Sequence, residues 1–412
     1  MSFTSAGSRW ADVYLVAAGR GISICGELLA ATTLALVLQS AGHGGFAVAG
    51  LLLAATLPIA LLAPFSGRLA DRADSRTLLV VIGVAQAAIC AVLAFATHPV
   101  LIVALVAALA AGLSITQPTL AALVPRMVRP ADFPKASGIV QSAGQIGMLA
   151  APALAGVLIG QTGQRGPLLI GAVSYLSLVA IGLLLRTRRH GATEKDQQAA
   201  APFRLWDDRT LTVMTIAVAS VVAGVSAINV FDIFFVRETL GASTTVYGLV
   251  SASWSAGMLL GSPLGSRIPE HRRTVGTVLA LLGAACLAVL IGGATAGSAW
   301  VLIPFWVAGG FFNGLLNVST NVLIVSRVRP EAHGRAFSVY GASVQAAGIV
   351  GFFVAGPLVE FFDPRVLVAG AGAAGLLAAL ACVPLIRGEV RSQTRTAPAT
   401  SMRDEIGDNV AS

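Results

Sequence analysis

Charged side chains are scarce in this sequence. Aspartate, glutamate, lysine and arginine make up 11% of its 412 residues, whereas hydrophobic residues make up 56%. A typical soluble domain has about 25% charged residues. The shortage of charge therefore excludes an ordinary soluble protein and indicates that lipid is the main solvent.

Residues that commonly carry catalysis or bind metals are also few. The five histidines fall in expected connections between apolar segments, and neither an HExxH nor a GxSxG motif occurs. The four cysteines occur singly, without the spacing of a metal site. Neither lysine, Lys135 or Lys195, lies in a phosphate-binding loop. We therefore expect no metal, no cofactor and no enzymatic activity, although a polytopic membrane enzyme is an alternative, and we expect transport by an ion gradient or by facilitated diffusion.

Long apolar runs, in contrast, are abundant. Twelve runs are each long enough to cross a hydrocarbon core of about 30 Å as a helix. They lack the alternation of membrane β-strands, and a backbone in lipid must satisfy its own hydrogen bonds, so we expect helices. The spans are expected at 13–38, 46–65, 77–97, 100–123, 136–160, 167–185, 210–235, 246–265, 274–294, 299–323, 336–361 and 365–385. The predicted fold class is an all-α polytopic membrane protein.

The basic residues lie almost entirely on one side of these spans. With the amino terminus in the cytoplasm, 23 of the 27 lysines and arginines fall in cytoplasmic segments, three fall outside, and Arg20 lies within a span. The positive-inside rule then places both termini in the cytoplasm. We expect a multi-pass, monomeric protein of the plasma or inner membrane, in contact with the lipid bilayer. Because topology accounts for the net charge of +8, nucleic acid is not an expected partner.

The chain divides near its middle into two similar halves. The sequence RMVRPADFPKA at 126–136 is echoed by RVRPEAHGRA at 327–336. Repeated halves of this kind are typical of secondary transporters built from two pseudo-symmetric six-helix bundles. The expected units are a first bundle at 1–185, a cytoplasmic loop at 186–209, a second bundle at 210–386 and a disordered cytoplasmic tail at 387–412.

The charged segment between the second and third spans resembles the signature loop of the major facilitator superfamily. Gly67, Asp71, Arg72 and Arg76 fit its pattern, Gly-x-Leu-Ala-Asp-Arg-x-Gly-Arg-Arg/Lys, whereas Asp74 stands where the second glycine is usual. The resemblance implies the major facilitator fold. It also implies a conformational switch in which Asp71 faces the positive end of a helix in the other half and holds the cytoplasmic side shut in one state. A solvated turn that only supplies positive charge is the alternative.

Residues 147–156, GMLAAPALAG, resemble the fifth-helix motif of antiporters in this superfamily. Gly147, Pro152 and Gly156 fit the motif, and alanine replaces two of its glycines. Overall the chain is similar to drug–proton antiporters that export macrolides, tetracyclines and siderophores, which implies proton-coupled efflux of a small amphipathic organic compound by alternating access. An arginine usual in the fourth helix of proton antiporters is missing. Small-residue helix packing is the alternative for the motif, and an importer or facilitator of a small polar nutrient is the alternative function.

Glu27 is the leading candidate for proton coupling, because ionisable groups inside a membrane are costly and commonly functional. Ser23 and Arg20 lie four and seven positions earlier, which places all three on one helix face. Arg20 and Glu27 are about 10 Å apart along the helix axis, too far for a direct ion pair. A hydrogen-bonded structural acid is the alternative for Glu27, and an arginine that reaches the headgroups is the alternative for Arg20.

Other polar residues within spans are candidates for the substrate cavity. They are Gln117, Gln145, Asn229, Asp232, Asn313 and Asn317. The family resemblance implies that the first, fourth, seventh and tenth helices line this cavity. Hydrogen bonds between helices are the alternative role for the asparagines, and a solvated rim is the alternative position for Asp232.

Overall fold

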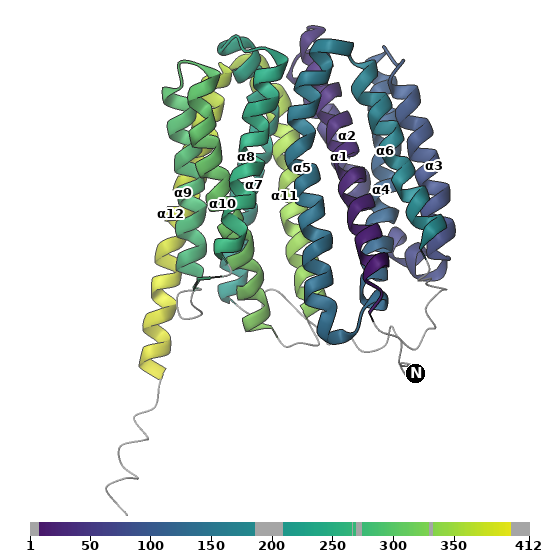
Figure 1. Ribbon diagram of the computed structural model, residues 1–412. Helices are drawn as coiled ribbons and strands as arrows, with labels where there is room; N and C mark the ends of the chain where they lie inside the picture. Colours follow the sequence, from purple (N-terminus) through teal and green to yellow (C-terminus); the bar gives the residue numbers. More distant parts are fainter. Residues whose placement is uncertain (1–7, 186–208, 266, 269–273, 329–332, 397–412) are drawn as a thin grey trace, which may run out of the picture.

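The chain forms a bundle of twelve long helices in the residues that the structure describes (Figure 1). This computed structural model describes the backbone of residues 8–185, 209–265, 267–268, 274–328 and 333–396, and no strand occurs within them. The helices are α1 (Trp10–Ser40), α2 (Gly45–Arg72), α3 (Ser75–Leu93), α4 (Pro99–Met127), α5 (Phe133–Thr162), α6 (Arg165–Leu184), α7 (Arg209–Phe234), α8 (Thr244–Gly265), α9 (Val275–Thr295), α10 (Ala299–Arg327), α11 (His333–Phe361) and α12 (Pro364–Thr396). A 3₁₀ turn, η1 (Pro130–Asp132), precedes α5, and a π-helix, η4 (Phe235–Thr239), continues α7.

The length and composition of these segments explain why they are helices in a membrane. Eleven of the twelve described helices are long and apolar enough to span a bilayer, and only α8 is not among them. Its 22 residues still rise about 33 Å, but Ser251, Ser253 and Ser255 make it less apolar than the others. All twelve expected spans are therefore confirmed as helices.

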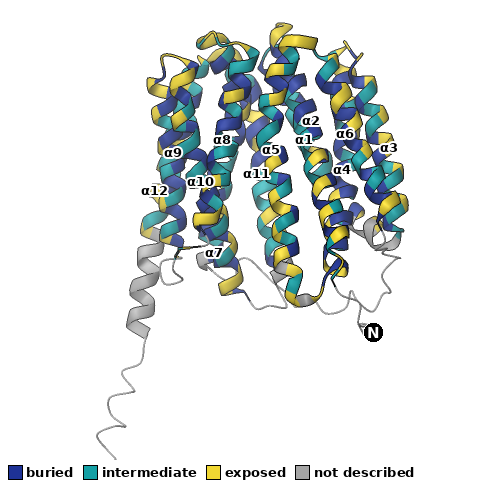
Figure 2. Cartoon of the chain, viewed as in Figure 1, coloured by how far each residue is buried: buried dark blue, intermediate teal, exposed yellow. Residues whose placement is uncertain are grey.

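Large apolar side chains lie on the outside of the bundle as well as in its core. Phe353, Leu377 and Leu61 are more than half exposed, and Figure 2 shows exposed positions along the whole length of the helices. A surface of this kind would be unfavourable in water, whereas acyl chains cover it in a bilayer. This pattern fits a multi-pass membrane protein.

Two helix ends differ from the sequence-based expectation. The segment expected to be a loop after residue 65 is helical, because α2 continues to Arg72 and only Ala73 and Asp74 connect it to α3. The Asp74 carboxylate accepts a hydrogen bond of 3.2 Å from the backbone N–H of Thr77, so it caps α3. α12 continues to Thr396, beyond the boundary expected at residue 386, and 397–412 of the expected tail lies outside the described residues. Most of the central loop expected at 186–209 also lies outside them.

The two halves of the bundle repeat one packing pattern. In the first half, α1 packs against α5 and α6, α3 against α4 and α6, and α2 against α4. In the second half, α7 packs against α11 and α12, α9 against α10 and α12, and α8 against α10. Adding six to each helix number of the first half gives the pairs of the second half. This correspondence confirms the expected architecture of two pseudo-symmetric six-helix bundles.

The halves approach each other closely at one end of the bundle. We call the end at which α1 begins and α12 ends the terminal end (lower in Figure 1), and the opposite end the far end. Near the far end, a Cβ at Gly156 of α5 would lie 3.1 Å from the Cα of Gly248 of α8, and Thr245 donates a hydrogen bond of 3.3 Å to the Gly156 carbonyl. Between α2 and α11, a Cβ at Gly45 would lie 2.6 Å from the carbonyl oxygen of Gly356. Glycine at these positions lets the two halves meet backbone to backbone.

Candidate transport cavities

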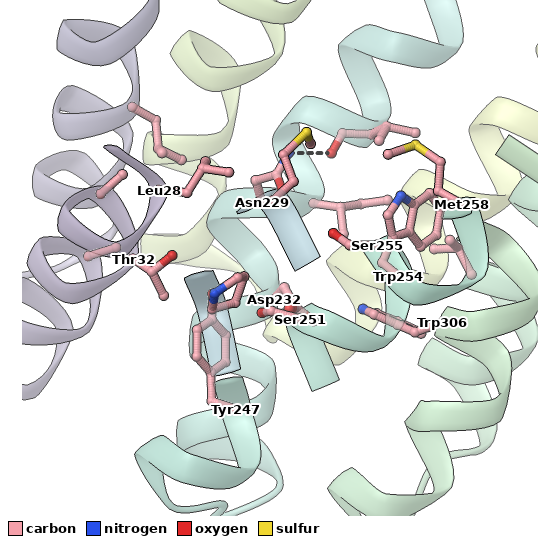
Figure 3. Close-up of a pocket in the computed structure, with 18 of the residues that line it drawn as sticks. Leu28, Thr32, Asn229, Asp232, Tyr247, Ser251, Trp254, Ser255, Met258 and Trp306 are labelled. Atoms are coloured by element: carbon pink, nitrogen blue, oxygen red, sulfur yellow. Dashed lines mark hydrogen bonds between the residues drawn. The ribbon is translucent and has the colours of Figure 1, made fainter. Parts of the chain in front are cut away.

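A central cavity of about 490 Å³ lies between the two halves and is lined mainly by apolar and aromatic side chains (Figure 3). Its lining residues are Leu28, Ala31, Thr32 and Ala35 of α1, Leu52 of α2, Met148 and Pro152 of α5, Val225, Ile228, Asn229 and Asp232 of α7, Tyr247, Ser251, Trp254, Ser255 and Met258 of α8, Val289 of α9, Trp306 of α10, and Phe352 of α11. Ligand pockets of drug-like molecules fall in this size range and have this kind of lining. The second half supplies most of the wall.

Asp232 is the acidic group of the central cavity. Its side chain is 6% exposed, and its Oδ1 atom has no hydrogen-bond partner in the described structure. Figure 3 shows it beside Ser251, with Asn229 one helical turn away on α7. The Asn229 amide donates a bond of 3.3 Å to the Val225 carbonyl within α7. A buried carboxylate oxygen without a donor is unfavourable unless something else provides one, so Asp232 is suited to meet a ligand.

Two tryptophans form the aromatic side of the central cavity, and each is packed against a glycine of a neighbouring helix. A Cβ at Gly309 of α10 would lie 2.5 Å from Cζ3 of Trp254, and a Cβ at Gly292 of α9 would lie 2.8 Å from Cζ3 of Trp306. Because glycine has no side chain, the indole rings can lie directly against α10 and α9. Tyr247, which is 7% exposed, adds a third ring.

A second, much smaller cavity lies within the first half. Its volume is about 20 Å³, which is room for about one water molecule. Among its lining residues are Arg20, Ser23, Glu27 and Gln117, so α1 and α4 bring together four of the residues predicted from the sequence. No ion pair joins Arg20 to Glu27 among the described residues, as their spacing along α1 predicted. The arrangement can hold a proton or a water molecule but not an organic compound.

Three other predicted cavity residues line neither of these cavities. Asn317 donates a hydrogen bond of 2.9 Å to the side chain of Asn313, and its amide nitrogen lies 3.9 Å from the Met258 sulfur. The asparagines therefore bond to each other along α10, close to a cavity residue. Gln145 lies on α5 with intermediate exposure.

The antiporter-like motif of α5 contacts both halves. A Cβ at Gly147 would lie 2.3 Å from the carbonyl oxygen of Gly21 on α1. Pro152 lines the central cavity, and Gly156 meets α8 as described above. These contacts make α5 the helix through which the first half meets α8.

The residues of the predicted switch are described only in part. The backbone of Gly67, Asp71 and Arg72 belongs to the last turns of α2, and their side chains lie outside the described residues. Arg76 lies in the first turn of α3. The motif therefore forms the end of one helix and the start of the next, at the terminal end of the bundle.

The sequence analysis did not identify α8 as a cavity helix. Tyr247, Ser251, Trp254 and Met258 recur at spacings of four, three and four, which places them on one face. The reduced apolarity of this helix was the available signal. Of the helices expected to line the central cavity, α10 contributes Trp306 to its described lining, and α4 instead lines the small cavity through Gln117.

Comparisons with known proteins agree with this architecture. Residues 16–231 and 213–406 match the Major Facilitator Superfamily. Among solved structures, a point mutant of the nucleoside transporter NupG superposes with a TM-score of 0.73 at 15% identity, covering 90% of this chain and 99% of that chain. A bacterial homolog of the human lysosomal transporter Spinster, in an inward-facing and unoccupied conformation, superposes with a TM-score of 0.68 at 15% identity, covering 92% of this chain and 95% of that one. No curated protein matches this chain significantly.

Proposed function

The chain belongs to the major facilitator superfamily, and from that premise we propose that it exports small amphipathic organic compounds in exchange for protons. It is a transporter rather than an enzyme. The proposal of proton-coupled export rests on the two cavities. The larger has room for an organic molecule, and the smaller has room for a proton or a water molecule. We also place the protein in the cell membrane as a monomer. The terminal end would face the cytoplasm, because the segments expected on that side hold 23 of the 27 lysines and arginines.

The observation that carries the proposal is the central cavity between two halves that meet at the far end. Gly156 and Gly248 on one side, and Gly45 and Gly356 on the other, bring the backbones together there. Rocking of the halves about the cavity would separate these contacts and open the far end. The closed far end supports alternating access, with this structure as the state that is shut toward the outside.

The lining of the central cavity supports an amphipathic substrate. About 490 Å³ accommodates a drug-sized molecule, and four aromatic side chains, Tyr247, Trp254, Trp306 and Phe352, line it together with aliphatic residues. The polar side chains of the lining are few, and most belong to the second half: Asn229, Asp232, Ser251 and Ser255, with Thr32 contributed by α1. A small polar nutrient would leave much of the apolar wall without favourable contacts.

Glu27 is our proposed proton site. No described residue donates a hydrogen bond to its carboxylate, and a charged carboxylate within a membrane is costly without a partner. Protonation removes that cost, so binding and release of a proton change the free energy of this region. If Glu27 exchanges protons with the outside in one state and with the cytoplasm in the other, the proton gradient drives rocking of the halves.

The switch proposed at Gly67, Asp71, Arg72 and Arg76 would act at the terminal end. The end of α2 carries three of these residues and the start of α3 the fourth, so all four move with the first half. Contacts from Asp71 to a helix end of the second half would hold the terminal side shut when the far end opens. Asp71→Asn would then lower the transport rate without affecting ligand binding.

Everted and right-side-out membrane vesicles test the proposal. Everted vesicles acidified inside should accumulate lipophilic compounds, and Glu27→Gln should abolish this pH-driven accumulation. Asp363→Asn is the matched control, because Asp363 is exposed at the far end between α11 and α12 and lines neither cavity. If Glu27→Gln transports as fast as the unmodified protein under the same pH gradient, Glu27 is not the proton site. Accumulation of a polar nutrient such as a nucleoside in right-side-out vesicles would favour the importer instead.

A further inference from the structure

We propose that the central cavity selects monovalent organic cations, with Asp232 as the counter-ion and Trp254 and Trp306 as the surfaces that hold the body of the ligand. This inference rests on the proposed transport function, because it names the substrate class of that cavity. It concerns binding alone and needs no assumption about the coupling ion.

The charge balance of the lining supports a cation. Asp232 is the carboxylate of the cavity, and no lysine, arginine or histidine occurs among the described lining residues. Its side chain is only 6% exposed, and its Oδ1 atom lacks a hydrogen-bond donor. A buried carboxylate without a partner is strongly unfavourable, whereas a cation bound beside it compensates the charge. An anionic ligand would add a second uncompensated negative charge, so the cavity should reject it.

The aromatic rings support a cation for a second reason. The face of an indole carries negative electrostatic potential and attracts a cation within about 6 Å of the ring centre. Gly309 and Gly292 hold the two indoles against α10 and α9, so the rings are in place before a ligand binds. Figure 3 shows Asp232 and the two tryptophans from separate helices around one space. Carboxylate and aromatic groups together match a charged nitrogen or phosphorus centre with apolar substituents.

Tetraphenylphosphonium and tetraphenylborate are suitable probes, because they have nearly the same shape and opposite charge. Triphenylphosphine oxide provides a neutral probe and uridine a neutral polar one. Equilibrium dialysis with the full-length protein in detergent should show that the phosphonium binds at least tenfold more tightly than the other three. Equal binding of the borate, or preferential binding of uridine, would overturn the proposal.

Two substitutions at Asp232 test whether its carboxylate is the cause of the preference for cations. Asp232→Asn should lower phosphonium affinity at least tenfold and leave the weak binding of triphenylphosphine oxide unchanged, whereas Asp232→Glu should restore much of the affinity. Asp363→Asn should leave all affinities unchanged. Unchanged phosphonium affinity in Asp232→Asn would refute the assignment of the counter-ion. If that variant does not fold, the comparison of the four probes on the unmodified protein still decides the question.

The outcomes separate this inference from the proposed function. Cation-selective binding without pH-driven transport would contradict proton coupling and leave the inference intact. Conversely, pH-driven efflux that depends on Glu27 but accepts the four probes equally would support the transport mechanism and overturn the cation assignment.

Discussion

The two cavities that contain acidic residues differ in size and in charge. The cavity at Glu27 measures about 20 Å³ and contains Arg20, whereas the cavity at Asp232 measures about 490 Å³ and has no basic residue in its described lining. The first has room for a proton or a water molecule and the second for an organic compound. This difference in volume and charge is why we propose separate carboxylates for the coupling ion and the substrate, Glu27 in the first half and Asp232 in the second.

A hydrogen bond at the far end connects the two helices that carry these acids. Gln39 near the end of α1 donates a bond of 2.9 Å to the carboxylate of Glu238 in η4, which continues α7. Glu27 lies on α1 and Asp232 on α7. The two acids therefore line separate cavities, and the helices that carry them are joined at the far end by this bond, which the proposed rocking of the halves would break.

The largest effect should come from Glu27→Gln, which tests whether the sites are separable. Net pH-driven transport should fall roughly a hundredfold, because the variant can no longer bind and release the proton there. Exchange of labelled for unlabelled substrate, which needs no net proton movement, should persist at a similar rate. Measuring both fluxes in the same proteoliposomes checks this. Loss of exchange together with net transport would mean that Glu27 also serves substrate binding.

A substitution behind Trp254 should affect the large cavity alone. Gly309→Ala would place a Cβ 2.5 Å from the Trp254 ring, so the ring must move. Affinity for the cavity ligand, measured by equilibrium dialysis, should fall about tenfold. Gly370→Ala on α12 is the control, because a Cβ there meets nothing within 4 Å. An unchanged affinity in Gly309→Ala would show that the position of this ring does not matter to binding.

The features that the sequence predicted well depend on local properties. Apolar length determines a membrane helix, so all twelve spans could be placed from the sequence. Acids within such spans are rare, which singled out Glu27 and Asp232 before their surroundings were known. The grouping of Arg20, Ser23 and Glu27 follows from helical spacing along α1 alone.

The features that the sequence did not predict depend on which face of a helix meets which neighbour. Serine and tryptophan are compatible with several environments, and the position of the Trp254 ring depends on its contact with Gly309 of another helix. The asparagines of α10 are polar and helically spaced, yet two of them bond to each other outside the cavity. Asp74 lies in the short connection between α2 and α3, and the sequence analysis did not foresee that its carboxylate caps α3.

Removing the hydrogen bond between α1 and η4 should have a moderate effect on opening of the far end. This substitution tests how far that bond holds α1 and α7 together. Gln39→Leu loses one partly buried hydrogen bond, worth about 1 kcal/mol, so opening of the far end should increase roughly fivefold. Hydrogen exchange at residues 36–40 and 236–242 should speed up accordingly. Ser40→Ala is the neighbouring control, because its hydroxyl bonds only to the Val37 carbonyl of the same helix. No change in exchange would mean that the far end is held by the glycine contacts alone.

The smallest effect should come from Asn317→Ala, which tests the boundary of the large cavity. The Asn317 side chain bonds to Asn313 on its own helix and reaches the cavity only through the Met258 sulfur, at 3.9 Å. Ligand affinity should therefore change less than twofold, against at least tenfold for Asp232→Asn, in the same dialysis experiment. A fall comparable to that of Asp232→Asn would extend the binding surface along α10. Asp232 and the Asn317 amide would then both contribute to ligand binding, although Asn317 does not line the cavity in this structure.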